Sequence, residues 1–247
     1  MTKKIIFLSV FFLIFVARIP DLHGENGYVR VNMPDGSVYE GDFLEGVFDG
    51  KGILLLDNGN RYEGDFRDGL PEGNGVLSWE NGNRYEGEFK DGLPNGKGVF
   101  LWANGDKYEG VFVNGMPEGH GKAVWRNGDK YEGEFKKGSP EGSGKAVWAT
   151  GDVYKGEFLD AVPHGRGERI FINGDRHIGE FRNGYPEGKG IYIWDNGDRF
   201  EGEFHGEKPD GRGIMIFSSG DTLKGIFRNG KLVQEEEVTL SGAGEQG

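Results

Sequence analysis

Hydrophobic and polar positions alternate in short segments along most of this chain. In residues 84–89, an aromatic residue, a glycine and a second aromatic residue take alternate positions, and charged residues take the positions between them. This period of two residues predicts a β-strand with one apolar and one charged face. A second strand is predicted over residues 98–102. The pattern favours an all-β fold built from short strands.

Turn-forming residues separate the predicted strands. Residues 91–96 read Asp-Gly-Leu-Pro-Asn-Gly and predict a reversal of the chain, because glycine allows positive φ and proline fixes φ. Asn104-Gly105 is the pair favoured in type I′ turns and predicts a tight two-residue hairpin. In this scheme the prolines fall in the longer turn and never inside a strand. These prolines are Pro71, Pro94, Pro117, Pro140, Pro163, Pro186 and Pro209.

The whole arrangement recurs at a constant period along the chain, without an insertion. Such a period is the signature of a repeat architecture, in which each module packs against its neighbours. We expect nine tandem 23-residue β-hairpin repeats, with about 18 strands in one elongated, single-layer antiparallel sheet. The repeats start at Tyr39, Tyr62, Tyr85, Tyr108, Tyr131, Tyr154, His177, Phe200 and Leu223.

Both ends of the array depart from the repeat. Residues 25–38 contain a lone strand, predicted over residues 28–31, and form a capping strand. The repeat array covers residues 39–233, and its ninth repeat stops after Gly230 without the Gly-x-Gly pair of the others. The tail, residues 234–247, is acidic and is expected to be disordered.

The glycine between the two aromatic residues of the first strand has a mechanical role. Because Gly87 lacks a side chain, rings from flanking positions are expected to lie over bare backbone and cover the apolar face of a single sheet. The tryptophans share one phase at the end of the second strand. Together these rings form an aromatic stripe, which is the candidate partner-binding surface: Tyr62, Tyr85, Tyr108, Tyr131, Trp79, Trp102, Trp125, Trp148 and Trp194.

Composition supports the periodic fold and narrows the choice of partners. The 47 glycines and the 13% of aromatic residues suit turns and strands. Removing residues 1–24 changes the net charge from -12 to -14, because 26 basic and 40 acidic residues remain. A chain this acidic repels nucleic acid and anionic lipid, so that nucleic acid is excluded and membrane lipid is disfavoured. The absence of cysteine excludes disulfides, thiolate metal sites and a cysteine nucleophile.

Residues 1–24 form a separate segment. Two lysines precede an apolar run over residues 5–17, which is too short to cross a bilayer that needs about 20 residues. A basic start followed by a short apolar body predicts a signal peptide, and therefore export to the periplasm, the cell surface or the medium. An uncleaved membrane anchor formed by residues 5–17 is the alternative.

The repeated motif resembles that of a known family. Tyr-Glu-Gly-Glu-Phe, seven residues, Gly-x-Gly, an aromatic residue and then Asn-Gly is similar to the MORN repeat (membrane occupation and recognition nexus), over residues 28–230. The resemblance implies consecutive hairpins with an aromatic-lined groove, and a scaffold or targeting module that docks proteins, dimerises or binds phospholipid. Lys155, Ala161, the pair 177–178 and Gly206 depart from the motif, and a bend or a specific contact is expected there.

Other chemistry finds less support in the sequence. Carboxylate pairs such as Glu86 and Glu88 have the spacing of glycosidase pairs, but they recur along the chain, whereas an enzyme needs one desolvated site. We interpret them as a solvated face balanced by basic residues. The turns lack EF-hand spacing, and residues 138–145 miss the spacing of a phosphate loop. We expect no catalytic residue, no metal site and no cofactor.

These patterns favour a non-enzymatic repeat scaffold that binds proteins, including a second copy of itself, through the extended aromatic-lined sheet. A membrane- or phospholipid-associated targeting module is the alternative. A carbohydrate-active enzyme that uses the carboxylate rows is a third class. The aromatic stripe itself has two interpretations, which are packing within the fold and an open groove for a peptide, a sugar or a lipid tail.

Overall fold

The computed structural model describes residues 26–236, and the predicted N-terminal segment lies outside these residues. The described residues contain nineteen β-strands and no helix, which confirms the all-β prediction. The strands fall into two halves, residues up to 140 and residues from 141 onward, and each half is described by itself. The predicted tail starts at residue 234, and Gln234 and Glu235 belong to the last strand. Residues 237–247 of the tail lie outside the described residues.

The strands follow one another along the sequence. The N-terminal half contains β1 (Gly27–Asn32), β2 (Val38–Leu44), β3 (Val47–Leu55), β4 (Arg61–Arg67), β5 (Leu70–Ser78), β6 (Arg84–Lys90), β7 (Leu93–Leu101), β8 (Lys107–Val113), β9 (Met116–Val124) and β10 (Lys130–Lys136). The C-terminal half contains most of β11 (Ser139–Val147), and β12 (Val153–Leu159), β13 (Val162–Ile170), β14 (Arg176–Arg182), β15 (Tyr185–Ile193), β16 (Arg199–His205), β17 (Lys208–Ile216), β18 (Thr222–Arg228) and β19 (Lys231–Glu235).

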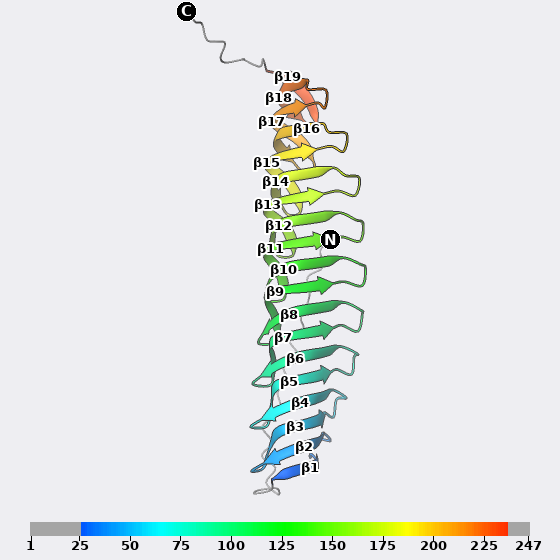
Figure 1. The fold of residues 1–247 in the computed structure, drawn as a ribbon, viewed down its shortest axis with the longest axis vertical. Helices are drawn as coiled ribbons and strands as arrows, with labels where there is room; N and C mark the ends of the chain where they lie inside the picture. The colour runs from blue at the N-terminus through cyan, green and yellow to red at the C-terminus, as the bar shows by residue number, and fades with distance from the viewer. Residues whose placement is uncertain (1–25, 237–247) are drawn as a thin grey trace, which may run out of the picture. The chain divides into compact units, whose positions relative to one another are not determined.

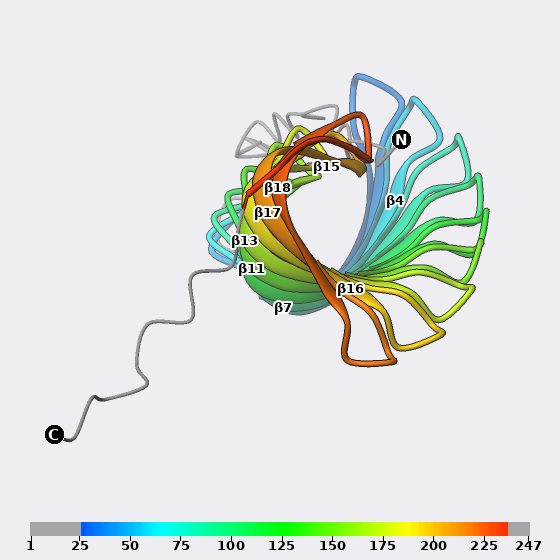
Figure 2. The same cartoon turned by 90° about the horizontal axis from the view of Figure 1, so that it is seen from above.

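Within each half, every strand pairs antiparallel with the next strand in sequence, so that the sheet grows one hairpin at a time (Figure 1). The register is the same in each repeat. Gly75 faces Gly87 between β5 and β6, and Gly167 faces Gly179 between β13 and β14. Successive wide turns are rotated stepwise within each half, as expected for a twisted sheet (Figure 2).

The two turn types are exchanged relative to the sequence prediction. Asp91-Gly92 forms the tight turn between β6 and β7, and its two φ angles are 49° and 79°, as a type I′ turn requires. Asn104-Gly105 lies in a wider turn, where the Gly105 N–H donates to the Trp102 carbonyl at 2.9 Å. The Trp102 N–H donates to the Asp106 carbonyl at 2.9 Å, which gives a type I turn followed by a glycine bulge. The prediction of a tight turn at Asn104-Gly105 is therefore wrong.

The prediction that proline stays outside the strands is also wrong. Pro94 is the second residue of β7, and the other six repeat prolines hold the same place in their strands. The register between β6 and β7 shifts between Gly87 and Phe89, and Pro94 faces Phe89 just beyond this bulge. A sheet accepts proline at a bulge, where its missing N–H is not needed. The Pro94 carbonyl accepts a hydrogen bond at 2.9 Å from Gly115 in the next tight turn.

The predicted role of the strand glycines is confirmed. Gly87 faces Gly98, and the ring of Tyr85 lies over this pair. A Cβ atom on Gly98 would lie 2.5 Å from Cε2 of Tyr85 and 2.6 Å from Cζ. The Tyr85 hydroxyl donates to the Glu88 carbonyl at 2.9 Å, so that the buried phenol is satisfied by the backbone.

The core of each half is a continuous series of perpendicular rings. Tyr85 meets Phe89 of its own repeat edge-on at 5.1 Å and Phe112 of the next repeat at 4.9 Å. In the C-terminal half, Tyr154 meets Phe158 at 5.1 Å and Phe181 at 4.9 Å. We call this series the ring zipper, which comprises the leading ring of each of the first eight repeats and the phenylalanine four residues after the start of each repeat. Each perpendicular pair contributes about 1 kcal/mol beyond its buried area.

Candidate functional site

The aromatic stripe predicted from the sequence consists of two rows with different exposure. Burial places the tyrosines in the core and raises the pKa of each phenol above its ordinary value. A phenol that packs between two phenylalanines and bonds to the backbone has no surface to offer a partner. These tyrosines, all at most 2% exposed, are Tyr62, Tyr85, Tyr108 and Tyr131.

The tryptophan row is the accessible part of the stripe. Each of its members stands at the start of a wide turn, where its backbone closes the turn. Four of them are half-buried, and the fifth, Trp125, is 6% exposed. In the N-terminal half, Phe100 packs against Trp102 at 4.4 Å and Trp79 at 5.3 Å. The row consists of Trp79, Trp102, Trp125, Trp148 and Trp194.

The paired carboxylates of the charged face have separate structural tasks. Glu86 forms an ion pair with Arg84 at 2.7 Å. Glu88 accepts a hydrogen bond at 3.1 Å from the backbone N–H of Lys97, at the bulge where the strand register shifts. In the preceding repeat, Asp65 accepts in the same way from the N–H of residue 74. The spacing of these carboxylates therefore has a structural cause that recurs between repeats.

The polar residues of the wide turns link each turn to the next. The Asp106 N–H donates to Oδ1 of Asn104 at 2.9 Å, and Oδ1 of Asp106 accepts from the N–H of Arg126 in the next wide turn at 2.7 Å. Asp198 and Ser218 repeat this link in the C-terminal half at 2.8 Å. The side-chain oxygens of these turns, which lack EF-hand spacing, thus accept hydrogen bonds from backbone amides.

His177 replaces the tyrosine of the ring zipper in the seventh repeat. Its ring is fully buried, edge-on to Phe181 at 5.2 Å and to Phe204 at 4.6 Å. Neither ring nitrogen has a hydrogen-bond partner. Burial, together with the charge of Arg169, lowers the pKa of His177 to about 4, and the ring is therefore neutral at pH 7.

Sequence reasoning did not single out the polar cluster around Arg169. The guanidinium lies over the ring of Phe171 at 4.5 Å and is 5.7 Å from the ring of Trp148. It pairs with Asp152 at 2.7 Å and with Glu207 at 3.4 Å. The signal in the sequence was a charged residue in the apolar phase of β13, which a comparison of equivalent positions between repeats reveals.

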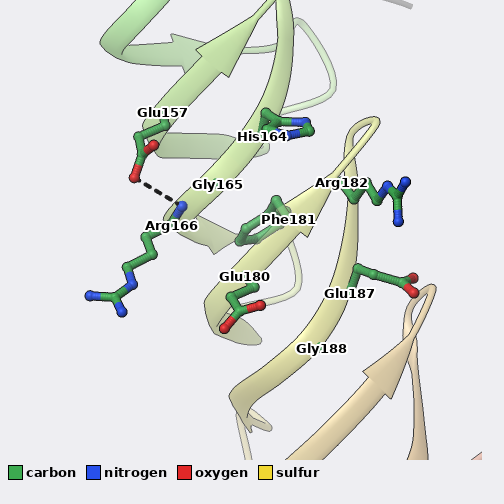
Figure 3. A pocket seen from close by; sticks show the side chains of 9 residues that line it. All are labelled: Glu157, His164, Gly165, Arg166, Glu180, Phe181, Arg182, Glu187 and Gly188. Atoms are coloured by element: carbon green, nitrogen blue, oxygen red, sulfur yellow. Dashed lines mark hydrogen bonds between the residues drawn. The ribbon is translucent and has the colours of Figure 1, made fainter.

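A hollow of about 660 Å³ opens on the C-terminal half. Arg166, Arg182, Glu180 and Glu187 line it together with Phe181 and four further residues (Figure 3). No serine, threonine or cysteine is among its lining residues, so the hollow brings no hydroxyl or thiol nucleophile next to a base. Its lining includes three glutamates and two arginines, so that acidic side chains outnumber basic ones by one when His164 is neutral.

Within residues 26–236, no group of three or more histidine, cysteine, aspartate or glutamate side chains is placed to hold a metal ion. The same residues contain no helix of the length and apolar character that a membrane crossing demands.

The hairpin order, the constant register and the ring zipper together define a tandem β-hairpin repeat protein. The family model for the MORN repeat matches eight consecutive segments, and the chain belongs to this family. The resemblance expected from the sequence is thereby confirmed. The matched segments are residues 39–61, 62–84, 85–107, 108–130, 131–153, 154–176, 177–199 and 200–222. The ninth predicted repeat, which starts at Leu223 in β18, lies beyond them.

Comparison with curated proteins found no match. Among solved structures, the chain is similar to a mutant of the TCP10 domain of Danio rerio CPAP, with a TM-score of 0.48, 16% identity, and coverage of 85% of this chain and 99% of that chain. It is also similar to the wild-type TCP10 domain of Danio rerio CPAP in complex with a peptide of Danio rerio STIL. That comparison gives a TM-score of 0.49, 14% identity, and coverage of 86% and 100%.

Proposed function

We propose that this chain is a non-enzymatic repeat scaffold that binds other proteins, including a second copy of itself, through its extended aromatic-lined sheet. The observation that carries the proposal is the difference in burial between the tyrosine row and the tryptophan row. The tyrosines and phenylalanines of the ring zipper are buried in the core, whereas most of the tryptophan row stays half-buried at the surface. Tryptophan is enriched among residues that dominate protein interfaces, because it buries a large area at low entropic cost.

The repeats provide matched variants that test the proposal. Leucine already occupies the tryptophan position in the first repeat, at Leu56, so Trp102→Leu keeps a residue that the fold accepts. The neighbouring Leu101 is 38% exposed, and serine occupies its position in the second repeat, at Ser78. Leu101→Ser is therefore the control variant: it changes the residue next to Trp102, at the end of β7, and leaves the tryptophan row intact.

The experiment is a pull-down with residues 25–247 as bait, combined with light scattering for self-association. We expect Trp79→Leu combined with Trp102→Leu to weaken partner binding at least about tenfold, as loss of an interface hot spot does. Leu101→Ser is expected to leave binding unchanged. Equal binding by all variants, or no partner and no self-association with the unchanged chain, would count against the proposed function.

Export and membrane binding are separate proposals. The basic start and the apolar run of residues 5–17 support export through a signal peptide, which N-terminal sequencing of the secreted protein tests. Membrane association is the alternative function, and vesicles of phosphatidylcholine and phosphatidylserine test it by sedimentation. Binding of residues 25–247 to these vesicles would contradict the repulsion expected from a net charge of -14.

A further inference from the structure

Arg169 is a charged residue at a position of β13 where the equivalent strands of the other repeats carry an uncharged residue. Equivalent positions of the other repeats hold uncharged residues, two of which, Phe100 and Tyr192, contact the tryptophan row. An arginine there loses hydration, so its presence needs specific partners. The equivalent residues are Leu54, Leu77, Phe100, Ala123, Ala146, Tyr192 and Met215.

Two rings and one carboxylate fix the Arg169 guanidinium. Trp148 and Phe171 contact it through their faces, as in a cation–π arrangement. Nη2 lies 2.7 Å from Oδ2 of Asp152, whose side chain is only 14% exposed. The other oxygen of Asp152 accepts from the N–H of Ile172 at 3.0 Å, so the backbone holds this carboxylate in place.

The second carboxylate on Arg169 is held much less firmly. Nη1 lies 3.4 Å from Oε1 of Glu207, whose side chain is 53% exposed. Nε of Arg169 is buried and has no acceptor at all. The guanidinium is thus oriented on one side by Asp152, and its remaining hydrogen-bonding capacity is only partly used.

Glu207 reaches Arg169 from a distant part of the chain. The two residues are 38 positions apart, whereas the links between wide turns described above join residues 20 positions apart. Glu207 belongs to the turn between β16 and β17, where the glycine precedes it at Gly206 instead of following. The Glu207 side chain of this displaced turn, in the eighth repeat, thus contacts the guanidinium of Arg169 in the sixth repeat.

We propose that Arg169 is a binding site for a carboxylate of a docked protein segment, and that Glu207 occupies this site until the segment displaces it. The bound carboxylate belongs to a residue or chain end with an adjacent aromatic side chain, because Trp148 and Phe171 flank the guanidinium. An exchange of one carboxylate for another leaves the local charge unchanged. This inference rests on the proposed protein-binding function and names the partner chemistry of one repeat.

The test uses N-acetyl-L-phenylalanine as the probe and N-acetyl-L-phenylalanine amide as its uncharged counterpart. Binding to the full chain is followed by NMR through the Arg169 Nε–H and Trp148 indole signals. We expect the acid to bind more tightly than the amide, and Glu207→Gln to tighten acid binding at least about fivefold, as the release of a competing group does. Glu201→Gln, which removes a carboxylate paired with Arg199 at 2.7 Å, is the control and should change nothing.

The second variant of the test is Arg169→Met. Methionine occupies the equivalent position in the eighth repeat, at Met215, so the variant is expected to fold. This variant should lose the preference for acid over amide. Equal affinity for acid and amide in the unchanged chain and in Glu207→Gln, or a preserved preference in Arg169→Met, overturns the site. Those results leave the proposed scaffold function standing, since other outcomes count against that function: equal binding by the tryptophan variants, or no partner and no self-association with the unchanged chain.

Discussion

At the residue scale, each repeat depends on a glycine pair that leaves room for one ring. In β9, Gly119 and Gly121 differ in backbone conformation and in what surrounds them. A Cβ atom on Gly119 meets nothing within 4 Å, although its φ of 69° disfavours other residues. A Cβ atom on Gly121 would lie 2.6 Å from Cε2 of Tyr108. The first position therefore constrains the backbone, and the second constrains the core.

We predict that Gly119→Ala lowers the free energy of unfolding by about 1 kcal/mol, the cost of a left-handed conformation. Gly121→Ala is expected to lower it by about 3 kcal/mol, because the Tyr108 ring and its hydrogen bond to the Val111 carbonyl must shift. Urea denaturation of both variants checks this order. Equal losses would show that the ring does not depend on the glycine.

At His177, in contrast to the glycine positions, a substitution is expected to stabilise the protein. His177→Tyr restores the hydroxyl that bonds the backbone in other repeats and removes two buried nitrogens without partners. We expect the variant to be more stable by about 1–3 kcal/mol, which is the cost of an unsatisfied buried polar group. Thermal unfolding at pH 7 measures the gain, and a less stable variant would contradict the argument.

His177 also makes stability depend on pH. Its pKa in the folded chain is about 4, below the ordinary value of 6.5, so the unfolded chain takes up the proton first as the pH falls. Stability is therefore fully present above pH 6.5 and is lost by about 3 kcal/mol as the pH falls toward 4. Urea midpoints across this range should fall less steeply for His177→Tyr than for the unchanged chain.

At the scale of single elements, the tight turns decide how each hairpin closes. Most of them carry glycine at their second position, but the turn between β12 and β13 uses Asp160 and Ala161, with φ angles of 50° and 64°. Alanine pays a steric cost there that glycine avoids. The turn between β14 and β15 has Gly184 at the same place, with a φ of 87°.

These two turns permit reciprocal substitutions. We expect Ala161→Gly to raise the free energy of unfolding by about 1 kcal/mol, and Gly184→Ala to lower it by about the same amount. Differential scanning calorimetry of both variants tests the pair. If Ala161→Gly is instead less stable, the buried methyl group of Ala161 outweighs the strain of its backbone.

The strands were predicted correctly where the alternation of apolar and charged residues is strict. The turns were predicted wrongly because two dipeptides in the third repeat suit the same turn type. The strand β6 was predicted from residues 84–89 because its alternation is strict, and the structure places it at Arg84–Lys90. Both Asp91-Gly92 and Asn104-Gly105 suit a type I′ turn, and local sequence does not rank them. The choice depends on the bulge beside Gly87, which lengthens β7 to include Pro94 and leaves a two-residue turn only at Asp91.

The candidate site was predictable in its residue types but not in its exposure. The constant period of the repeats identified both rows of the aromatic stripe. It did not show that Tyr85 is enclosed by a phenylalanine from the following repeat, because that contact depends on the stagger between hairpins. The Arg169 cluster escaped notice because Glu207 reaches it across an intervening repeat, which a repeat consensus does not encode.

At the scale of the whole molecule, the constant register predicts which deletions the chain tolerates. Removing residues 88–110 takes out one full period and leaves the Phe112 ring four positions after Tyr85, as in an intact repeat. Removing residues 88–109 falls one position short of a period and leaves five positions between the two rings, which then point to opposite faces. Only the first deletion preserves the ring zipper.

We expect the full-period deletion to remain an all-β protein with cooperative thermal unfolding, because stability in such arrays is a sum of repeats and their contacts. The shorter deletion should lose cooperativity or aggregate. Circular dichroism and light scattering on both proteins compare them directly. Similar behaviour of the two deletions would contradict a register fixed by the ring zipper.

The ring zipper also bears on how a gene for this protein changes over generations. Each leading ring finds its second phenylalanine in the repeat that follows, as Tyr62 does with Phe89. An in-frame duplication of one repeat therefore encodes both halves of every new contact at once. Descendant proteins can therefore gain or lose whole repeats without compensating mutations elsewhere in the chain.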